Sequence, residues 1–353
     1  MNEVKKNKIY LSLAKVSSWT GLSRIFGLIR DVVTTNLLGA SVFHDIFVVT
    51  LKIPNLFRRF FAEGAFNQAF IPIYSDYQKG NDEKNTQEFI NSLAGSFLSI
   101  LFLFTILVLL ITPIFIFIFA PGFYYDDSKR IIAIDLLRIM FPYLALISLV
   151  SFASGIQNTH EKFSIPAFTP LIFNITLIVA AIFIAPIINL PVYALAWGVL
   201  IAGFLQLLIH IYALKNINRL PTPKINFSHP GQINVLKLMI PAILAGGIVQ
   251  INLLIDTIFA SLLQTGSPTW LYVSDRLIQF PMGIFAIAIG TILLPTLSKI
   301  DVATNKKLFI HELQKGQRFV LLIGIPSLIG LYLCSIDLIG TIFFRGEFTA
   351  YDV

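Results

Sequence analysis

Residues 97–120 read FLSILFLFTILVLLITPIFIFIFA, a run without a single charged side chain. A bilayer core about 30 Å thick is crossed by roughly 20 helical residues, so this segment is long enough to span it. The rest of the 353-residue chain is similarly apolar: 56% of its residues are hydrophobic, 13% are charged, and the mean hydropathy is +0.79. Soluble domains are about 25% charged. The composition therefore excludes an ordinary water-soluble globule.

Further apolar runs of comparable length lie on both sides of this segment, separated by polar or proline- and glycine-rich breaks. They predict an all-α polytopic membrane protein with about nine transmembrane helices. The predicted spans cover residues 16–38, 42–63, 89–120, 131–157, 165–188, 192–214, 233–263, 270–297 and 319–344.

The positions of Lys and Arg predict the orientation of these spans, because cytoplasmic loops are enriched in both residues. With a cytoplasmic N-terminus, the cytoplasmic side holds 15 of the 26 Lys and Arg residues and the opposite side holds three. The net charge of +7 then reflects membrane topology, and we expect no nucleic-acid partner. Because the first apolar run carries arginines and continues past a normal signal length, we expect it to be retained.

A polar connection at residues 216–232, rich in proline, is the longest break between spans. It predicts a division into an N-lobe of six transmembrane helices, residues 1–218, and a partial C-lobe of three, residues 219–353.

Charged side chains inside the spans are the unusual feature of this sequence. Arg24, Arg30 and Asp31 share the first span, and an arginine at the bilayer centre costs about 2.5 to 3.5 kcal/mol on insertion scales. On an ideal helix the two arginines lie about 120° apart and about 9 Å along the axis, which suits the wall of a wide cavity. The alternative is that Arg30 forms a structural ion pair with Asp31 or another buried acid while Arg24 snorkels to an interface.

The second span carries a polar stripe on an otherwise apolar helix. Pro54 removes a backbone hydrogen bond and makes the helical register beyond it unreliable, so Arg58 could turn inward instead of Arg59. The alternative is that both arginines anchor the cytoplasmic end of a shorter span. The stripe consists of Asp45, Lys52, Asn55, Arg59 and Glu63.

Two further acids lie within predicted spans. Asp275 adjoins Arg276 in the eighth span, and Asp256 stands alone in the seventh. A lone intramembrane acid indicates either a proton or sodium site or an ion pair with a neighbouring helix.

Signatures of catalysis or of a bound cofactor are absent from the sequence. The five histidines have no zinc-like spacing, Cys334 is the only cysteine, and no glycine-rich phosphate loop occurs. We therefore expect no enzyme active site, metal or other cofactor. Any transport would be driven by an ion gradient such as Na⁺, by the membrane potential or by the gradient of the substrate.

A long ordered set of motifs resembles the MurJ/MviN family of bacterial lipid II flippases. The motifs are Ser23-Arg24, Gly27, Arg30-Asp31, Pro54-Asn55, Arg58-Arg59, Ala62-Glu63-Gly64-Ala65-Phe66, Ala69-Phe70, Pro72, Asp275-Arg276 and Gly290-Thr291-Ile292-Leu293-Leu294-Pro295. The resemblance implies a MATE-like fold of two six-helix lobes around a cavity, followed by two helices that form a groove. Because that fold has fourteen spans, we expect this chain to be truncated at its C-terminus, with an incomplete second lobe.

The resemblance also implies the site. The family's cavity arginines fall on Arg24, Arg30, Arg58 and Arg276, with Ser23, Asp45 and Asn55 nearby. It favours Arg58 over Arg59, against the ideal helical register. Supporting positions are Lys52, Arg59, Glu63 and Asp275, and Asp256 resembles a sodium ligand of the family.

The implied substrate is lipid II, an undecaprenyl-pyrophosphate that carries the peptidoglycan disaccharide-peptide. Alternating access would move it from the cytoplasmic to the outer leaflet of the bacterial inner membrane. The other implied partners are membrane lipids and the cell-wall synthesis machinery. The alternatives are a flippase for another polyprenyl-linked oligosaccharide, a multidrug exporter of the same superfamily, or a membrane-embedded transferase that acts on a polyprenyl carrier.

Overall fold

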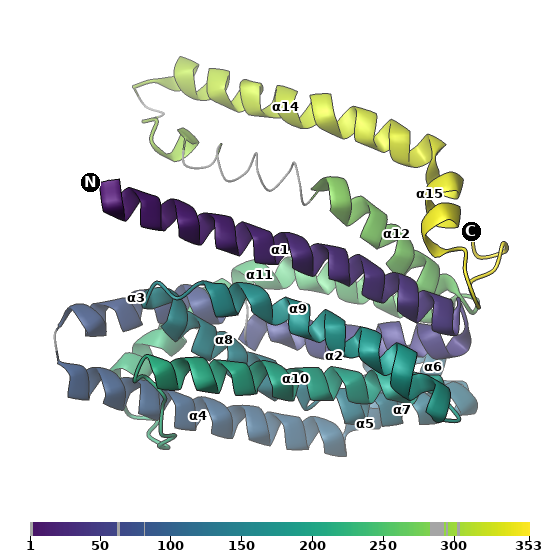
Figure 1. The fold of residues 1–353 in the computed structure, drawn as a ribbon, viewed down its shortest axis with the longest axis horizontal. Helices are drawn as coiled ribbons and strands as arrows, with labels where there is room; N and C mark the ends of the chain where they lie inside the picture. The colour runs from purple at the N-terminus through teal and green to yellow at the C-terminus, as the bar shows by residue number, and fades with distance from the viewer. Residues whose placement is uncertain (1–2, 62–63, 81, 283–292, 294–295, 302–303) are drawn as a thin grey trace.

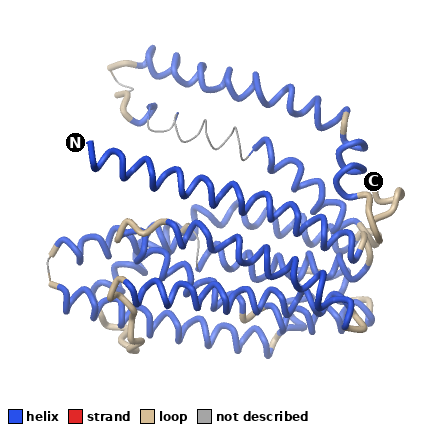
Figure 2. Tube along the Cα trace, viewed as in Figure 1, coloured by secondary structure: helices blue, strands red, loops and turns tan. Residues whose placement is uncertain are grey.

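A computed structural model describes residues 3–61, 64–80, 82–282, 293, 296–301 and 304–353. Every regular element in this part of the chain is a helix (Figures 1 and 2). The helices are α1 (Glu3–Leu38), α2 (Val42–Phe61), α3 (Ala65–Lys79), α4 (Glu83–Leu110), α5 (Thr112–Phe119), α6 (Pro121–Tyr124), α7 (Asp127–Met140), α8 (Tyr143–Thr159), α9 (Ser164–Val179), α10 (Pro191–Asn216), α11 (Pro230–Leu262), α12 (Ser267–Pro281), α14 (Lys306–Leu333) and α15 (Ser335–Phe343). A π-helical turn, Ala180–Ile184, and a 3-10 turn, Ala185–Ile187, extend α9. The all-helical fold class is confirmed.

Two predicted spans are each divided between helices in the structure. The segment at residues 89–120 begins earlier, at Glu83, where the side chain of Asp82 accepts a hydrogen bond from the Asn85 amide at 3.0 Å. It breaks after Leu110, just before a proline that occupies the first turn of α5. The segment at residues 131–157 is likewise divided into α7 and α8 around Pro142. Proline explains both breaks, because it lacks the amide that would continue the helical ladder.

The end of α7 that follows α6 is held by a local cap. The side chain of Asp126 accepts hydrogen bonds from the Ser128 hydroxyl at 2.6 Å and from the Ser128 and Lys129 amides at 3.1 and 3.2 Å. These bonds stabilise the charged carboxylate and hold the pKa of Asp126 below its usual value. Asp126 therefore caps the start of α7.

Five helical segments in the described part are long and apolar enough to cross a membrane, judged by length and composition. They are Glu83–Leu110, Asp127–Thr159, Ser164–Ile187, Pro191–Asn216 and Lys306–Leu333. The structure is therefore that of a multi-pass membrane protein. All nine predicted spans overlap helices, but the eighth continues into residues outside the described part, so the count of nine stays a prediction.

Aromatic side chains fill the interior of the main bundle. One core lies among α2, α7, α8 and α10, where Phe57 packs against Phe104 and Phe141 with ring centroids 5.2 and 6.1 Å apart. A second core joins α3, α4, α8 and α11 and contains the stacked rings of Phe66 and Phe70. These two cores fix the position of α2, which carries the predicted polar stripe.

The polar connection between α10 and α11 lies against α4. Asn91 holds it twice: its side-chain oxygen accepts a hydrogen bond from the Thr222 amide at 2.8 Å, and its backbone carbonyl accepts one from the Lys224 amide at 3.0 Å. Beyond this connection α11 packs against α3 and α2. The division into lobes at residue 218 stays a prediction.

Figure 1 shows α12 and α14 above α1, whereas α9 and α10 lie below it. α12 packs against α2 and α11, while α14 forms an outer edge of the molecule and is largely exposed along its apolar length. The chain thus places α12 beside the charged positions of α1 and α2.

Candidate functional site

Arg30 and Asp31 of α1 lie in the interior of the structure, although they are adjacent in sequence. Arg30 is 8% exposed and Asp31 is 1% exposed. The Nε and Nη2 atoms of Arg30 donate to Oδ1 of Asp31 at 3.0 and 2.6 Å. Its Nη1 atom donates to Oδ1 of Asn174, on α9, at 3.0 Å. Each of the three guanidinium nitrogens therefore donates a hydrogen bond, as a buried charge requires.

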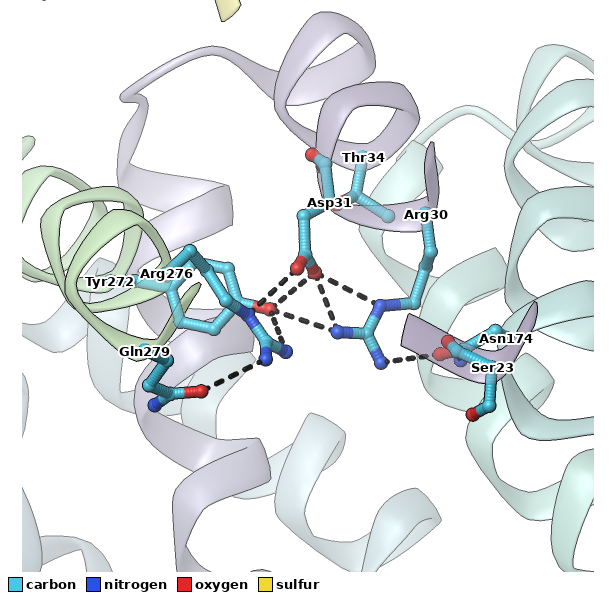
Figure 3. Close-up of polar contacts among 8 residues, drawn as sticks. All are labelled: Ser23, Arg30, Asp31, Thr34, Asn174, Tyr272, Arg276 and Gln279. Carbon is cyan, nitrogen blue, oxygen red and sulfur yellow. Dashed lines mark hydrogen bonds and ion pairs between the residues drawn. The ribbon is translucent and has the colours of Figure 1, made fainter. Parts of the chain in front are cut away.

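α12 supplies the other half of this cluster (Figure 3). The Tyr272 hydroxyl donates to Oδ1 of Asp31 at 2.5 Å, and Nε of Arg276 forms an ion pair with Oδ2 of Asp31 at 2.7 Å. Both Arg30 and Arg276 also donate to the Tyr272 hydroxyl, each at 3.2 Å. One carboxylate is thus shared by two guanidiniums that come from helices distant in sequence. This cluster connects α1 to α12.

A cavity of about 410 Å³ opens beside the shared carboxylate. Its wall is built by α1, α2, α8, α9, α10 and α12, and its charged lining is entirely cationic. The charged lining residues are Arg30, Lys52, Arg58 and Arg276. A neighbouring chamber of about 280 Å³ shares Lys52, Arg58 and Arg276 with this cavity and adds Arg59 and Asp275.

The structure brings most of the predicted binding positions to these two chambers. Asn55 and Arg58 line both of them, so the Pro54-containing helix does turn Arg58 toward the cavity. Arg59 lines only the smaller chamber, where its Nη1 atom donates to Oε1 of Gln250 at 3.2 Å. Lys52 lies within electrostatic reach of Asp275.

Four predicted positions lie away from the chambers or outside the described part. Arg24 is exposed on α1 and forms no ion pair or hydrogen bond with a described residue. Ser23 takes part only through its backbone carbonyl, which accepts from Asn174 at 3.0 Å. Glu63 lies outside the described residues. Asp256 is exposed on α11, within electrostatic reach of Lys52, and lines neither chamber.

Asp45 does not lie beside the cavity arginines, where we expected it. It is 2% exposed, and its carboxylate accepts hydrogen bonds from the Gly266 amide at 2.6 Å, the Thr269 amide at 3.0 Å and the Thr269 hydroxyl at 2.7 Å. These donors form the start of α12, where a negative charge is favoured. Asp45 therefore does not line the cavity: it holds the N-terminal end of α12 against α2.

Sequence reasoning missed Asn174, Tyr272 and His44, which all line the cavity. Tyr272 had a usable signal, since it precedes Arg276 by four residues and so faces the same side of α12. Asn174 is a single amide in an apolar helix, a pattern that does not distinguish a site from a packing contact. The described residues include no group of three or more His, Cys, Asp or Glu side chains placed to hold a metal ion.

The arrangement is suited to an anion. Guanidiniums offer planar pairs of donors that match phosphate oxygens, and a partly closed cavity screens their charge poorly. In this structure Asp31 forms ion pairs with Arg30 and Arg276, whereas Arg58 and Lys52 line the cavity from α2.

Comparison with known proteins identifies the family of this chain. The family model described as lipid II flippase MurJ matches residues 34–353. The chain belongs to the MurJ family of lipid II flippases. The probable lipid II flippase MurJ of Buchnera aphidicola (subsp. Acyrthosiphon pisum) is 41% identical over 97% of this chain and 67% of its own length. The probable lipid II flippase MurJ of Haemophilus influenzae is 40% identical over 95% of this chain and 68% of its own length. Lipid II flippase MurJ of Burkholderia cenocepacia is 37% identical over 98% of this chain and 68% of its own length.

Solved structures match the fold over nearly the whole chain. A lipid II flippase MurJ in an inward closed conformation is 29% identical with a TM-score of 0.80, over 96% of this chain and 69% of that one. An inward-facing multidrug resistance MATE family transporter of the MOP superfamily has a TM-score of 0.65 at 13% identity, which supports the MATE-like fold alone. The chain spans about two thirds of the length of the MurJ relatives described above. The named relatives are transporters rather than enzymes.

Proposed function

We propose that this chain moves lipid II from the cytoplasmic to the outer leaflet of the bacterial inner membrane by alternating access. The observation that carries the proposal is the cationic cavity whose guanidiniums share the single carboxylate of Asp31. The pyrophosphate of lipid II carries about two negative charges, and its oxygens can bind two guanidiniums in bidentate fashion. The polyprenyl tail would stay in the surrounding lipid.

Asp31 acts in this mechanism as an internal competitor of the pyrophosphate. In the closed arrangement it pairs with both Arg30 and Arg276, offsets one of their two positive charges and so keeps α12 on α1. An entering pyrophosphate takes over both guanidiniums and removes the reason for the two helices to stay together. Likeness to a MurJ structure in an inward closed conformation supports regarding the present arrangement as a closed one. Arg24, exposed here, would contact the head group after α1 and α12 separate.

Alternating access requires two bodies that rock against each other. The lobes at residues 1–218 and 219–353 would be these bodies, and the connection held by Asn91 would join them. With the N-terminus in the cytoplasm, a negative interior favours export of the anionic head group and return of the empty cationic cavity, by about 2.3 kcal/mol per charge per 100 mV. Na⁺ at Asp256 is the alternative source of coupling. Association with the cell-wall synthesis machinery would place the export step beside the use of its product.

Depletion of the protein in cells tests this function. If it is a flippase, completed lipid II accumulates in the inner leaflet when the protein is removed, because synthesis continues while export stops. If it is a transferase on the same carrier, the precursor of its own reaction accumulates and completed lipid II falls. An unchanged leaflet distribution of lipid II after depletion would contradict the proposal.

A further inference from the structure

His44 is a cavity residue to which the mechanism above gives no role. It lies on α2, is 0% exposed as a residue, and lines the cavity together with Arg30 and Tyr272. Its ring stands edge-on to the ring of Tyr272, with centroids 6.4 Å apart. His44 therefore sits directly beside the cluster that joins α1 to α12.

The hydrogen bonds around His44 determine which ring nitrogen carries the proton. The Thr269 hydroxyl has one hydrogen and donates it to Oδ1 of Asp45 at 2.7 Å, because a carboxylate can only accept. The same hydroxyl lies 3.3 Å from Nδ1 of His44, so Nδ1 is the donor in that contact. Neutral His44 thus carries its proton on Nδ1. Its Nε2 atom is left as an acceptor.

Nε2 is buried and has no partner of hydrogen-bond distance and angle among the described residues, although the backbone of Gly39 also lies near the ring. A buried acceptor without a partner is costly, so Nε2 requires a donor that enters the cavity, either water or a group of the substrate. The charged groups around the cavity are donors only: Arg30, Arg58, Arg276 and Lys52 cannot accept a hydrogen bond. They suit phosphate oxygens but not the hydroxyl and amide donors of a sugar.

We propose that Nε2 of His44 accepts a hydrogen bond from the saccharide next to the pyrophosphate, from a hydroxyl or an amide N–H. This inference rests on the proposed function, since it names a contact to the same head group. α12 is attached at its N-terminal end through Asp45, so a tilt about that end can lift Tyr272 from His44 while Thr269 stays on Nδ1. Nε2 then faces the head group that displaces Asp31.

The test uses two substitutions, each of which places an amide atom near the position of one of the two ring nitrogens. In His44→Asn the amide nitrogen can replace Nδ1 as donor to Thr269, but nothing reaches the position of Nε2. In His44→Gln the longer side chain places an acceptor oxygen near that position. We measure binding of two ligands to the purified protein: lipid II and undecaprenyl pyrophosphate without sugar. His311→Asn, on the exposed face of α14, controls for the substitution itself.

We expect His44→Asn to bind lipid II about tenfold more weakly than the wild type, the usual effect of losing one buried hydrogen bond. It should bind undecaprenyl pyrophosphate as the wild type does, and His44→Gln should restore lipid II binding to within about threefold. A thermal melting curve for each variant identifies loss of fold, which would weaken the binding of both ligands equally.

Equal lipid II affinity of His44→Asn and wild type would overturn the inference, as would weaker binding of both ligands in parallel at an unchanged melting temperature. Failure of His44→Gln to restore binding would also overturn it, because a neutral acceptor would then be insufficient. These outcomes differ from failure of the proposed function itself, in which the wild-type protein would bind neither pyrophosphate ligand.

Discussion

Asp31 determines the charge balance of the cavity at the scale of single residues. It is the carboxylate to which both Arg30 and Arg276 are paired, and at 1% exposure it has little help from solvent. Removing one member of a buried ion cluster is costly because the charge left behind is still desolvated. Under the proposed mechanism, the same residue is a structural partner in the closed state and a competitor of the anion during transport.

We expect Asp31→Asn to destabilise the protein by about 3 kcal/mol, because two guanidiniums then face each other across a neutral amide. Asn preserves the size of the side chain, so the effect reports the charge. Thermal unfolding in detergent measures it. A pyrophosphate-containing ligand should recover part of the loss, whereas a melting temperature equal to that of the wild type would show that the ion pairs with Asp31 carry no stability.

At the scale of elements, the attachment of α12 matters most, since this helix carries Tyr272 and Arg276 to the cavity. Asp45 of α2 accepts the first amides of α12. Loss of such a cap costs about 0.5 to 2 kcal/mol. We expect Asp45→Ala to reduce the free energy of unfolding by this amount and to displace α12. The free energy of unfolding of Asp45→Asn should lie between those of Asp45→Ala and the wild type, because one acceptor oxygen remains.

Cysteine cross-linking between α2 and α12, combined with thermal unfolding, measures the effect of the Asp45 substitutions. If Asp45→Ala keeps the wild-type cross-linking pattern and stability but loses lipid II binding, Asp45 is a substrate contact and not a cap.

The connection between α10 and α11 gives a second prediction for an element. A Cβ atom at Gly95 would overlap the backbone of Lys224, so Gly95→Ala must displace the connection from α4. Gly324→Ala is the matched control, since a Cβ there meets no atom within 4 Å on a helix of similar length. We expect faster proteolysis near Lys224 in Gly95→Ala only. Equal cleavage of both variants would show that the contact with Asn91 does not hold the connection.

These elements show which features a single sequence could predict. The helical spans and the charged positions of α1 and α2 were predicted because charge inside an apolar run is visible in the sequence itself. The preference for Arg58 came from the family motif, since Pro54 disturbs the ideal register. The role of Asp45 and the contact of Asp31 with Arg276 depend on residues more than 200 positions away in the chain, and no helical periodicity reports such pairs.

At the scale of the whole molecule, the orientation in the membrane is the main prediction from the distribution of Lys and Arg. We expect single cysteines that replace Lys224 or Lys307 to be labelled only after the membrane is opened, because both lie on the predicted cytoplasmic side. A cysteine at Arg130 should react in intact cells. Cys334 is exposed and must first be replaced by serine. Labelling of Lys224→Cys from outside would reverse the topology.

Affinity for lipid II in Arg30→Ala and Arg30→Lys tests most directly whether the cavity guanidiniums bind the head group. Arg318→Ala, which removes an exposed arginine of α14, is the control. We expect Arg30→Ala to lose at least about tenfold in affinity, since a charged hydrogen-bonded contact is worth about 1.5 to 3 kcal/mol. Arg30→Lys should keep part of the binding, because it retains the charge without the planar donor pair. Wild-type affinity in Arg30→Ala at matched stability would contradict binding of the pyrophosphate in this cavity.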